Sequence, residues 1–72
     1  MSMERIATFV RGRRRARGLS QQQLAEIAGV GQRFVSELER AKPTLRVSSV
    51  EQVLAVFGKE LGLTDRETEG DE

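Results

Sequence analysis

Residues 20–42, SQQQLAEIAGVGQRFVSELERAK, contain the pattern that decides the fold of this chain. Ser20 and Gln23 have the spacing of a capping box, in which side chains satisfy free backbone amides at the start of a helix. The pattern predicts a helix that begins directly after Ser20 and ends at Gly29, because glycine adopts the left-handed backbone of a helix end without steric cost. A second helix is predicted for residues 32–40. The stretch therefore predicts two short helices joined by a tight turn.

Each of these two helices has an apolar side. In the first, the core is expected to include Leu24, Ala25, Ala28 and Ile27. In the second, Val35 and Leu38 are three residues apart and share one face. The opposite face of the second helix carries only polar groups, from Gln32, Arg33, Ser36 and Glu37. A helix of this kind can bury one side in a small core and present the other side to a partner.

A helix of residues 3–17 is predicted to precede this pair, with Ser2 as its N-cap. Ile6, Phe9 and Val10 follow the spacing of one helix face. The apolar stripe then meets five arginines: Arg11, Arg13, Arg14, Arg15 and Arg17. Because successive residues of a helix are about 100° apart, these side chains spread around it, and at least one must lie near the core.

Pro43 interrupts helical structure in a connector over residues 41–46. A further helix is predicted for residues 47–57, ended by Gly58. Its apolar residues recur at helical spacing and form a wide face: Val50, Val53, Leu54 and Phe57, with Val47 and Val56 extending it. This face is wider than one small core requires.

Residues 59–64, KELGLT, alternate apolar and polar side chains and predict a short β-strand. An irregular extended segment is the alternative. The chain has no second strand signal, so a strand here pairs most simply with its own copy in a second subunit. Contacts in such a homodimer are predicted for Val53, Val56, Phe57, Leu61 and Leu63.

The length of 72 residues allows one small domain, predicted to span residues 1–64, with a disordered acidic tail over residues 65–72. The chain has no Cys, His or Tyr, so the usual general bases, nucleophiles and metal ligands are missing, and neither an enzyme nor a cofactor is expected. No apolar run approaches the roughly 18 residues of a membrane span. These features predict a cytoplasmic protein without a membrane partner.

Charge is distributed unevenly along the chain. Residues 1–46 contain ten Lys/Arg and four Asp/Glu, whereas residues 47–72 contain two and seven. A basic domain with an acidic end indicates a polyanionic partner for the first part, although a merely solvated Arg-rich surface is the simpler alternative. No aromatic residue lies among the basic ones outside the expected core, which argues against the stacking modes used for single strands and RNA.

Double-stranded DNA is the partner that accounts for most of these features together, with the polar face of residues 32–40 in the major groove. Gln32 has the groups to bond both edge positions of adenine, and Arg33 can fork onto guanine. Ser36 suits several bases, and Glu37 can accept from cytosine. The predicted phosphate contacts are Gln21, Gln22, Arg40, Lys42 and Arg46.

A set of residues at fixed spacing runs through the first three predicted helices: Val10, Arg11, Arg14, Arg15, Gly18, Leu19, Ser20, Gln21, Leu24, Ala25, Ala28, Gly29, Val30, Val35, Ser36, Leu38 and Glu39. Over about residues 5–57 the chain resembles the helix-turn-helix core of the Xre and Cro/C1-type phage-repressor family. The resemblance implies an all-α domain of four to five helices in which Arg14 is buried and pairs with Glu39. It also implies a phosphate contact at Gln21 and base readers at Gln32, Arg33, Ser36 and Glu37, with Gly31 an unusual residue in that set.

Residues 42–47, KPTLRV, and the segment 59–64 resemble a narrower branch of that family, the HipB-type antitoxins. In that branch a C-terminal strand pairs across a two-fold axis, and the dimer binds a palindromic operator and a HipA-type kinase toxin. The leading hypothesis is therefore a bacterial, nucleoid-associated homodimer that represses its own operon and acts as the antitoxin of a kinase-like toxin. The alternatives are a stand-alone phage-type or metabolic repressor, and a protein-interaction module that does not bind DNA.

Overall fold

The computed structural model describes residues 2–61, which form an all-α fold. Its helices are α1 (Met3–Ala16), α2 (Gln21–Ala28), α3 (Gln32–Glu39) and α4 (Val47–Val56). Each helix begins at its predicted residue and ends within one residue of its predicted end, so the all-α prediction is confirmed. None of these helices combines the length and the apolar character that crossing a membrane requires.

The predicted strand over residues 59–64 is not found in the part of it that the structure describes. Residues 59–61 have no regular secondary structure, and no β-strand lies anywhere within residues 2–61. An extended segment needs a neighbouring strand for its backbone groups, and the described chain provides none. The rest of the segment, including Leu63, and the predicted tail over residues 65–72 lie outside the described residues. Pairing between two copies stays a prediction.

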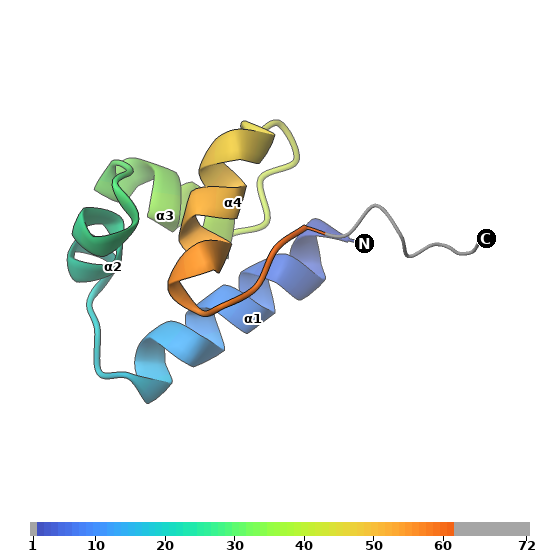
Figure 1. Ribbon diagram of the computed structural model, residues 1–72. Helices are drawn as coiled ribbons and strands as arrows, with labels where there is room; N and C mark the ends of the chain where they lie inside the picture. Colours follow the sequence, from blue (N-terminus) through green and yellow to red (C-terminus); the bar gives the residue numbers. More distant parts are fainter. Residues whose placement is uncertain (1, 62–72) are drawn as a thin grey trace.

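The four helices pack around one another in a simple order. α2 and α3 pack together across the turn that joins them, while α1 packs on α3 and α4 packs on α2. Figure 1 shows α1 running along one side of the molecule, with α2 and α3 at one end and α4 standing beside them. α3 is therefore held from two sides and keeps its remaining face open.

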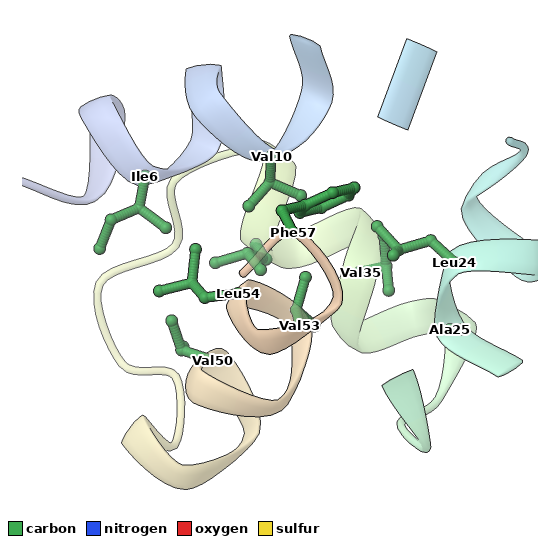
Figure 2. Packing of buried hydrophobic residues seen from close by; sticks show 10 residues of the cluster. Ile6, Val10, Leu24, Ala25, Val35, Val50, Val53, Leu54 and Phe57 are labelled. Atoms are coloured by element: carbon green, nitrogen blue, oxygen red, sulfur yellow. The ribbon is translucent and has the colours of Figure 1, made fainter. Parts of the chain in front are cut away.

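A hydrophobic core lies where the four helices meet. Its fully buried members come from every helix and are Val10, Leu24, Val35, Leu38 and Val53. Figure 2 shows how α1 and α4 add a layer of aliphatic side chains from Ile6, Val50 and Leu54. At one edge, Phe9 meets Phe57 edge-on, with 6.1 Å between the ring centroids.

Two apolar residues depart from the predicted core. Ile27 on α2 is 60% exposed, and Val47 at the start of α4 is 61% exposed. Ile27 is rotated by about 100° from the middle of the face formed by Leu24, Ala25 and Ala28, so it points away from the other helices. The assignment of Ile27 to the core, and the use of Val47 to extend the buried face of α4, were wrong.

The predicted cap and turn around α2 are confirmed. Ser20 Oγ accepts a hydrogen bond of 3.0 Å from the backbone amide of Gln23, and Gln23 Oε1 accepts one of 2.8 Å from the amide of Ser20. Gly29 has a φ of 78°, in the left-handed region that favours glycine. These two features fix where α2 begins and ends, and so fix the angle at which α3 leaves it.

The turn that follows α3 contains a left-handed residue that is not glycine. Ala41 has a φ of 61°, and its backbone amide donates to the carbonyl oxygen of Leu38 at 3.0 Å. The amide of Lys42 donates to the carbonyl oxygen of Glu37 at 3.1 Å. Together these bonds form a Schellman motif, the usual way to satisfy the last carbonyl groups of a helix. They fold the connector back and place Lys42 beside Glu37.

Candidate nucleic-acid interface

The buried residues of α3 define which side of the helix faces outward. Val35 and Leu38 are fully buried against the other helices, so the side chains opposite them point outward. The predicted base readers all lie on this outer side: Gln32 and Arg33 are exposed in the first turn, and Ser36 and Glu37 are half-buried one turn later. The structure therefore brings the four predicted readers together on one face of α3.

Glu37 is the anionic member of this face and is not free. Its Oε2 atom lies 3.3 Å from Arg33 Nε and 3.3 Å from Lys42 Nζ. The hydrogen bond from Lys42, with smaller contributions from the charge of Lys42 and from Arg33, holds the pKa of Glu37 below its ordinary value. Glu37 is therefore an anion shared by a predicted base reader and a predicted phosphate contact.

A buried ion pair joins α1 to the last residue of α3. Arg14 Nε donates to Glu39 Oε2 at 2.6 Å, and Arg14 Nη2 donates to Glu39 Oε1 at 3.0 Å. The Arg14 and Glu39 side chains are 12% and 3% exposed. Arg14 Nη1 also donates to the carbonyl oxygen of Leu19 at 2.9 Å, so this one guanidinium also contacts the loop before α2. The arginine that helical spacing placed near the core is Arg14.

The electrostatics of Glu39 reflect two opposed effects. Burial acts to raise the pKa of this carboxyl group. Hydrogen bonds from Arg14 and Gln21, and the charges of Arg14 and Arg11, outweigh burial and hold the pKa of Glu39 below its ordinary value. Glu39 is thus ionised at neutral pH although it is almost completely buried.

The two glutamines predicted to contact phosphate are in different environments. Gln21 is half-buried, and its Nε2 donates to Glu39 Oε1 at 3.2 Å. The amide group of Gln21 therefore faces the buried ion pair in the free protein. Gln22 is exposed at the start of α2, where unpaired backbone amides and the helix dipole favour an anion.

Three further arginines contact groups of the protein itself, and sequence reasoning did not find these contacts. Two of them, Arg11 and Arg13, belong to α1, and Arg17 follows directly after it. Arg11 Nη1 donates to the carbonyl oxygen of Glu39 at 3.2 Å, at the end of α3. Arg17 Nη1 donates to the carbonyl oxygen of Val56 at 3.1 Å, and its Cζ lies 4.9 Å from the ring centroid of Phe57. Arg13 Cζ lies 5.1 Å from the ring centroid of Phe9. Cations interact favourably with the carbonyl ends of helices. Which helix ends lie near α1 depends on tertiary packing, however, and cannot be predicted from local sequence.

The remaining predicted phosphate contacts follow α3 in the chain. Arg40 is exposed directly after α3, and Arg46 is exposed directly before α4. The Lys42 side chain is 49% exposed. Arg40 and Lys42 thus lie close to the end of α3 in sequence, and Arg46 lies at the start of α4. Across residues 2–61 no acidic cluster is arranged to hold a metal ion.

The residues predicted to form a dimer interface divide into two groups. Val53 is fully buried and Phe57 is 7% exposed, so both are used by the core of their own chain. Val56 and Leu61 are half-buried at the edge of that core and keep surface for a partner. Leu63 lies outside the described residues.

A short helix with a polar outer face, held across a glycine turn by a capped helix and backed by a small core, defines a helix-turn-helix domain. The sequence pattern of the Helix-turn-helix family matches residues 10–63, and the chain belongs to this family. The chain is also 45% identical over 53 residues to a protein of Sinorhizobium fredii (strain NBRC 101917 / NGR234) named as an uncharacterized HTH-type transcriptional regulator, y4mF. That match covers 74% of this chain and 70% of the relative. The broader of the two family resemblances is thereby confirmed, and the HipB-type branch stays a prediction.

Proposed function

We propose that this protein is a transcriptional repressor that binds double-stranded DNA in a sequence-specific manner, with α3 in the major groove. The observation that carries the proposal is the outer face of α3, which holds only polar side chains while its inner face is locked by Val35, Leu38 and the Arg14–Glu39 pair. A rigid helix with such a face is what groove recognition requires. Membership of the helix-turn-helix family and the regulator name of the relative support it.

In this proposal Gln32 and Arg33 read bases, since both are exposed in the first turn of α3 and amide and guanidinium groups match adenine and guanine edges. Ser36 makes a permissive contact one turn later. Phosphate contacts come from the backbone amides and side chains at the start of α2, Gln21 and Gln22, and from Arg40, Lys42 and Arg46. Arg33 and Lys42 both donate to Oε2 of Glu37. A contact of Glu37 with cytosine would therefore have to use its other carboxylate oxygen.

The test starts with duplexes enriched from a random-sequence pool by the full-length protein. Fluorescence anisotropy then gives the affinity for an enriched duplex and for a random duplex of the same length over a range of salt concentrations. We expect tighter binding to the enriched duplex and a logarithmic salt slope of about −0.9 for each phosphate contacted. A flat salt dependence, or equal affinity for both duplexes, would contradict sequence-specific DNA binding.

We propose further that the protein acts as a homodimer on a palindromic site, since a small helix-turn-helix domain gains affinity by binding two half-sites. Val56 and Leu61 are two apolar side chains near the end of the described residues that keep exposed surface. Leu61→Asp is expected to shift sedimentation of the full chain toward the monomer, whereas Lys59→Asp, at an exposed neighbouring position, leaves it unchanged. Equal behaviour of the two variants would argue against this interface.

The antitoxin role is the most specific part of the proposal. It rests on the resemblance of residues 42–47 and 59–64 to the HipB-type branch, in which the dimer also binds a kinase-like toxin. A gene for a kinase-like protein next to this one, and co-purification of the two products, would support the role. If no such gene is adjacent, a stand-alone repressor is the better description, and the DNA-binding proposal is unaffected.

A further inference from the structure

We propose that Glu37 is a positioning residue that sets the specificity of the α3 face. Its carboxylate holds the side chains of Arg33 and Lys42 in place, and its negative charge offsets part of their attraction to DNA that lacks the correct bases. This inference rests on the proposed DNA-binding function. It assigns Glu37 a role through its two cationic neighbours, in place of the predicted direct contact with cytosine.

The geometry around Glu37 carries the inference. One carboxylate oxygen, Oε2, accepts from both Arg33 Nε and Lys42 Nζ, each at 3.3 Å. The Glu37 side chain is 16% exposed, whereas those of Arg33 and Lys42 are 91% and 49% exposed. The anion is therefore the fixed and partly covered member of the trio, and the two cations extend from it toward solvent.

The backbone brings Lys42 to this position independently of charge. The amide of Lys42 donates to the carbonyl oxygen of Glu37, and the left-handed Ala41 turns the connector back along α3. Arg33 and Glu37 are four residues apart on α3, so they are neighbours on its surface. Main-chain geometry thus places the backbones of both partners near Glu37, and removal of the carboxylate is expected to free their side chains without moving these backbones.

The consequence for DNA binding follows from how exposed ion pairs behave. Such pairs are weak and are screened by salt, so a ligand that offers better contacts can take over either cation. A base edge in the correct position supplies directed hydrogen bonds to Arg33. A phosphate in a non-specific complex supplies mainly charge, and the negative charge of Glu37 offsets that attraction. Glu37 therefore weakens non-specific binding more than specific binding.

The experiment compares the full-length protein with Glu37→Gln, which keeps the size and one acceptor oxygen of the side chain and removes its charge. Affinities are measured for an enriched duplex and a random duplex of equal length, with thermal unfolding of each variant as the structural readout. We expect Glu37→Gln to bind the random duplex more tightly and to show a smaller preference for the enriched one. The logarithmic salt slope on the random duplex should steepen by about 0.9, because one more cation is free to neutralise a phosphate.

Two control variants separate the role of Glu37 from the effect of net charge. Glu51→Gln changes the net charge by the same amount at an exposed position of α4, and Glu51 forms no ion pair within residues 2–61. This variant should increase the affinity for the random duplex clearly less than Glu37→Gln does. Glu37→Asp keeps the charge and should retain most of the wild-type preference.

Three results would overturn the inference. If Glu37→Gln loses affinity for the enriched duplex alone, Glu37 is a base reader. If both affinities fall together with the thermal stability, its role is structural. If Glu51→Gln has the same effect as Glu37→Gln, net charge alone is responsible. Failure of the wild-type protein to bind either duplex at low salt is a different result, which refutes the proposed function and this inference with it.

Discussion

Arg14 and Glu39 form a bidentate ion pair, with 2.6 Å between Nε and Oε2, that ties the last turn of the basic first helix to the end of α3. The two side chains come from positions 25 residues apart and are both largely buried. Gln21 from α2 joins the same carboxylate. The pair therefore connects three helices at one point and fixes the orientation of the face proposed to read DNA.

The first prediction concerns the cost of breaking this pair. Arg14→Ala leaves Glu39 as a buried charge without its ion-pair partner, and we expect the free energy of unfolding to fall by about 3–5 kcal/mol. For a domain of this size that is a large share of the total stability. Urea unfolding provides the measurement. Arg15→Ala, at an exposed position of the same helix, is the control and should change stability by no more than about 0.5 kcal/mol.

A double variant distinguishes loss of the charge pair from loss of packing. Arg14→Met combined with Glu39→Leu removes both charges and fills the space with apolar side chains, a replacement that is often neutral or stabilising in other proteins. We expect it to recover most of the stability lost in Arg14→Ala. A double variant as unstable as the single one would show that the pair is needed for a reason other than charge compensation.

The second prediction is the pH dependence of stability. The pKa of Glu39 is lower in the folded protein than the value of 4.5 for a free carboxyl group. The unfolded state therefore binds the proton first, and the stabilisation by Glu39 is complete above about pH 5 and is lost as the pH falls toward the folded pKa. The free energy of unfolding, measured from about pH 7 to about pH 3, should decrease at the acidic end. Glu39→Gln should show a smaller decrease, and Glu37, whose pKa is also lowered, should contribute to what remains.

Ala41 provides the third prediction. Its φ of 61° is unfavourable for a residue with a Cβ atom. Ala41→Gly should therefore raise the free energy of unfolding by about 1 kcal/mol, measured by urea unfolding. Ala55→Gly, in the exposed part of α4, is the matched control and should lower it by up to about 1 kcal/mol. Loss of stability in Ala41→Gly would show that the left-handed turn after α3 is not as described.

Local signals in the sequence were sufficient to predict the helices. The Ser20 capping box, the turn at Gly29 and the apolar spacing of α4 each depend on residues close together in the chain, and each is present in the structure. Helix ends that use glycine were predictable for the same reason. The left-handed Ala41 was not, because alanine carries no preference for that conformation.

Interactions between distant residues could be predicted only in part. Helical spacing showed that some arginine of α1 had to lie near the core, and the family resemblance indicated Arg14 and its partner Glu39. Neither could show that Arg11 and Arg17 bond to the carbonyl ends of α3 and α4, since those contacts depend on how the helices pack. Among the arginines of the first helix, Arg14 is therefore paired with a carboxylate, whereas Arg11 keeps its charge and bonds to a carbonyl group of the protein.

The sequence predicted which residues of the candidate site share one face of α3, but it did not predict the contacts among them. The spacing of Gln32, Arg33, Ser36 and Glu37 places them on one side of a helix, as the structure has them. The bond from Lys42 to Glu37 depends on the fold of the connector after α3, which the sequence pattern left open.

The measurement that tests the central claim most directly is the effect of Gln32→Ala on the affinities for an enriched duplex and a random duplex. If α3 reads bases, the variant loses about 1–3 kcal/mol of binding free energy on the enriched duplex and binds the random duplex as the wild type does. Arg46→Ala, which removes a proposed phosphate contact, should weaken both complexes alike. Equal losses on both duplexes for Gln32→Ala, or no loss on either, would contradict the claim that α3 reads the DNA sequence.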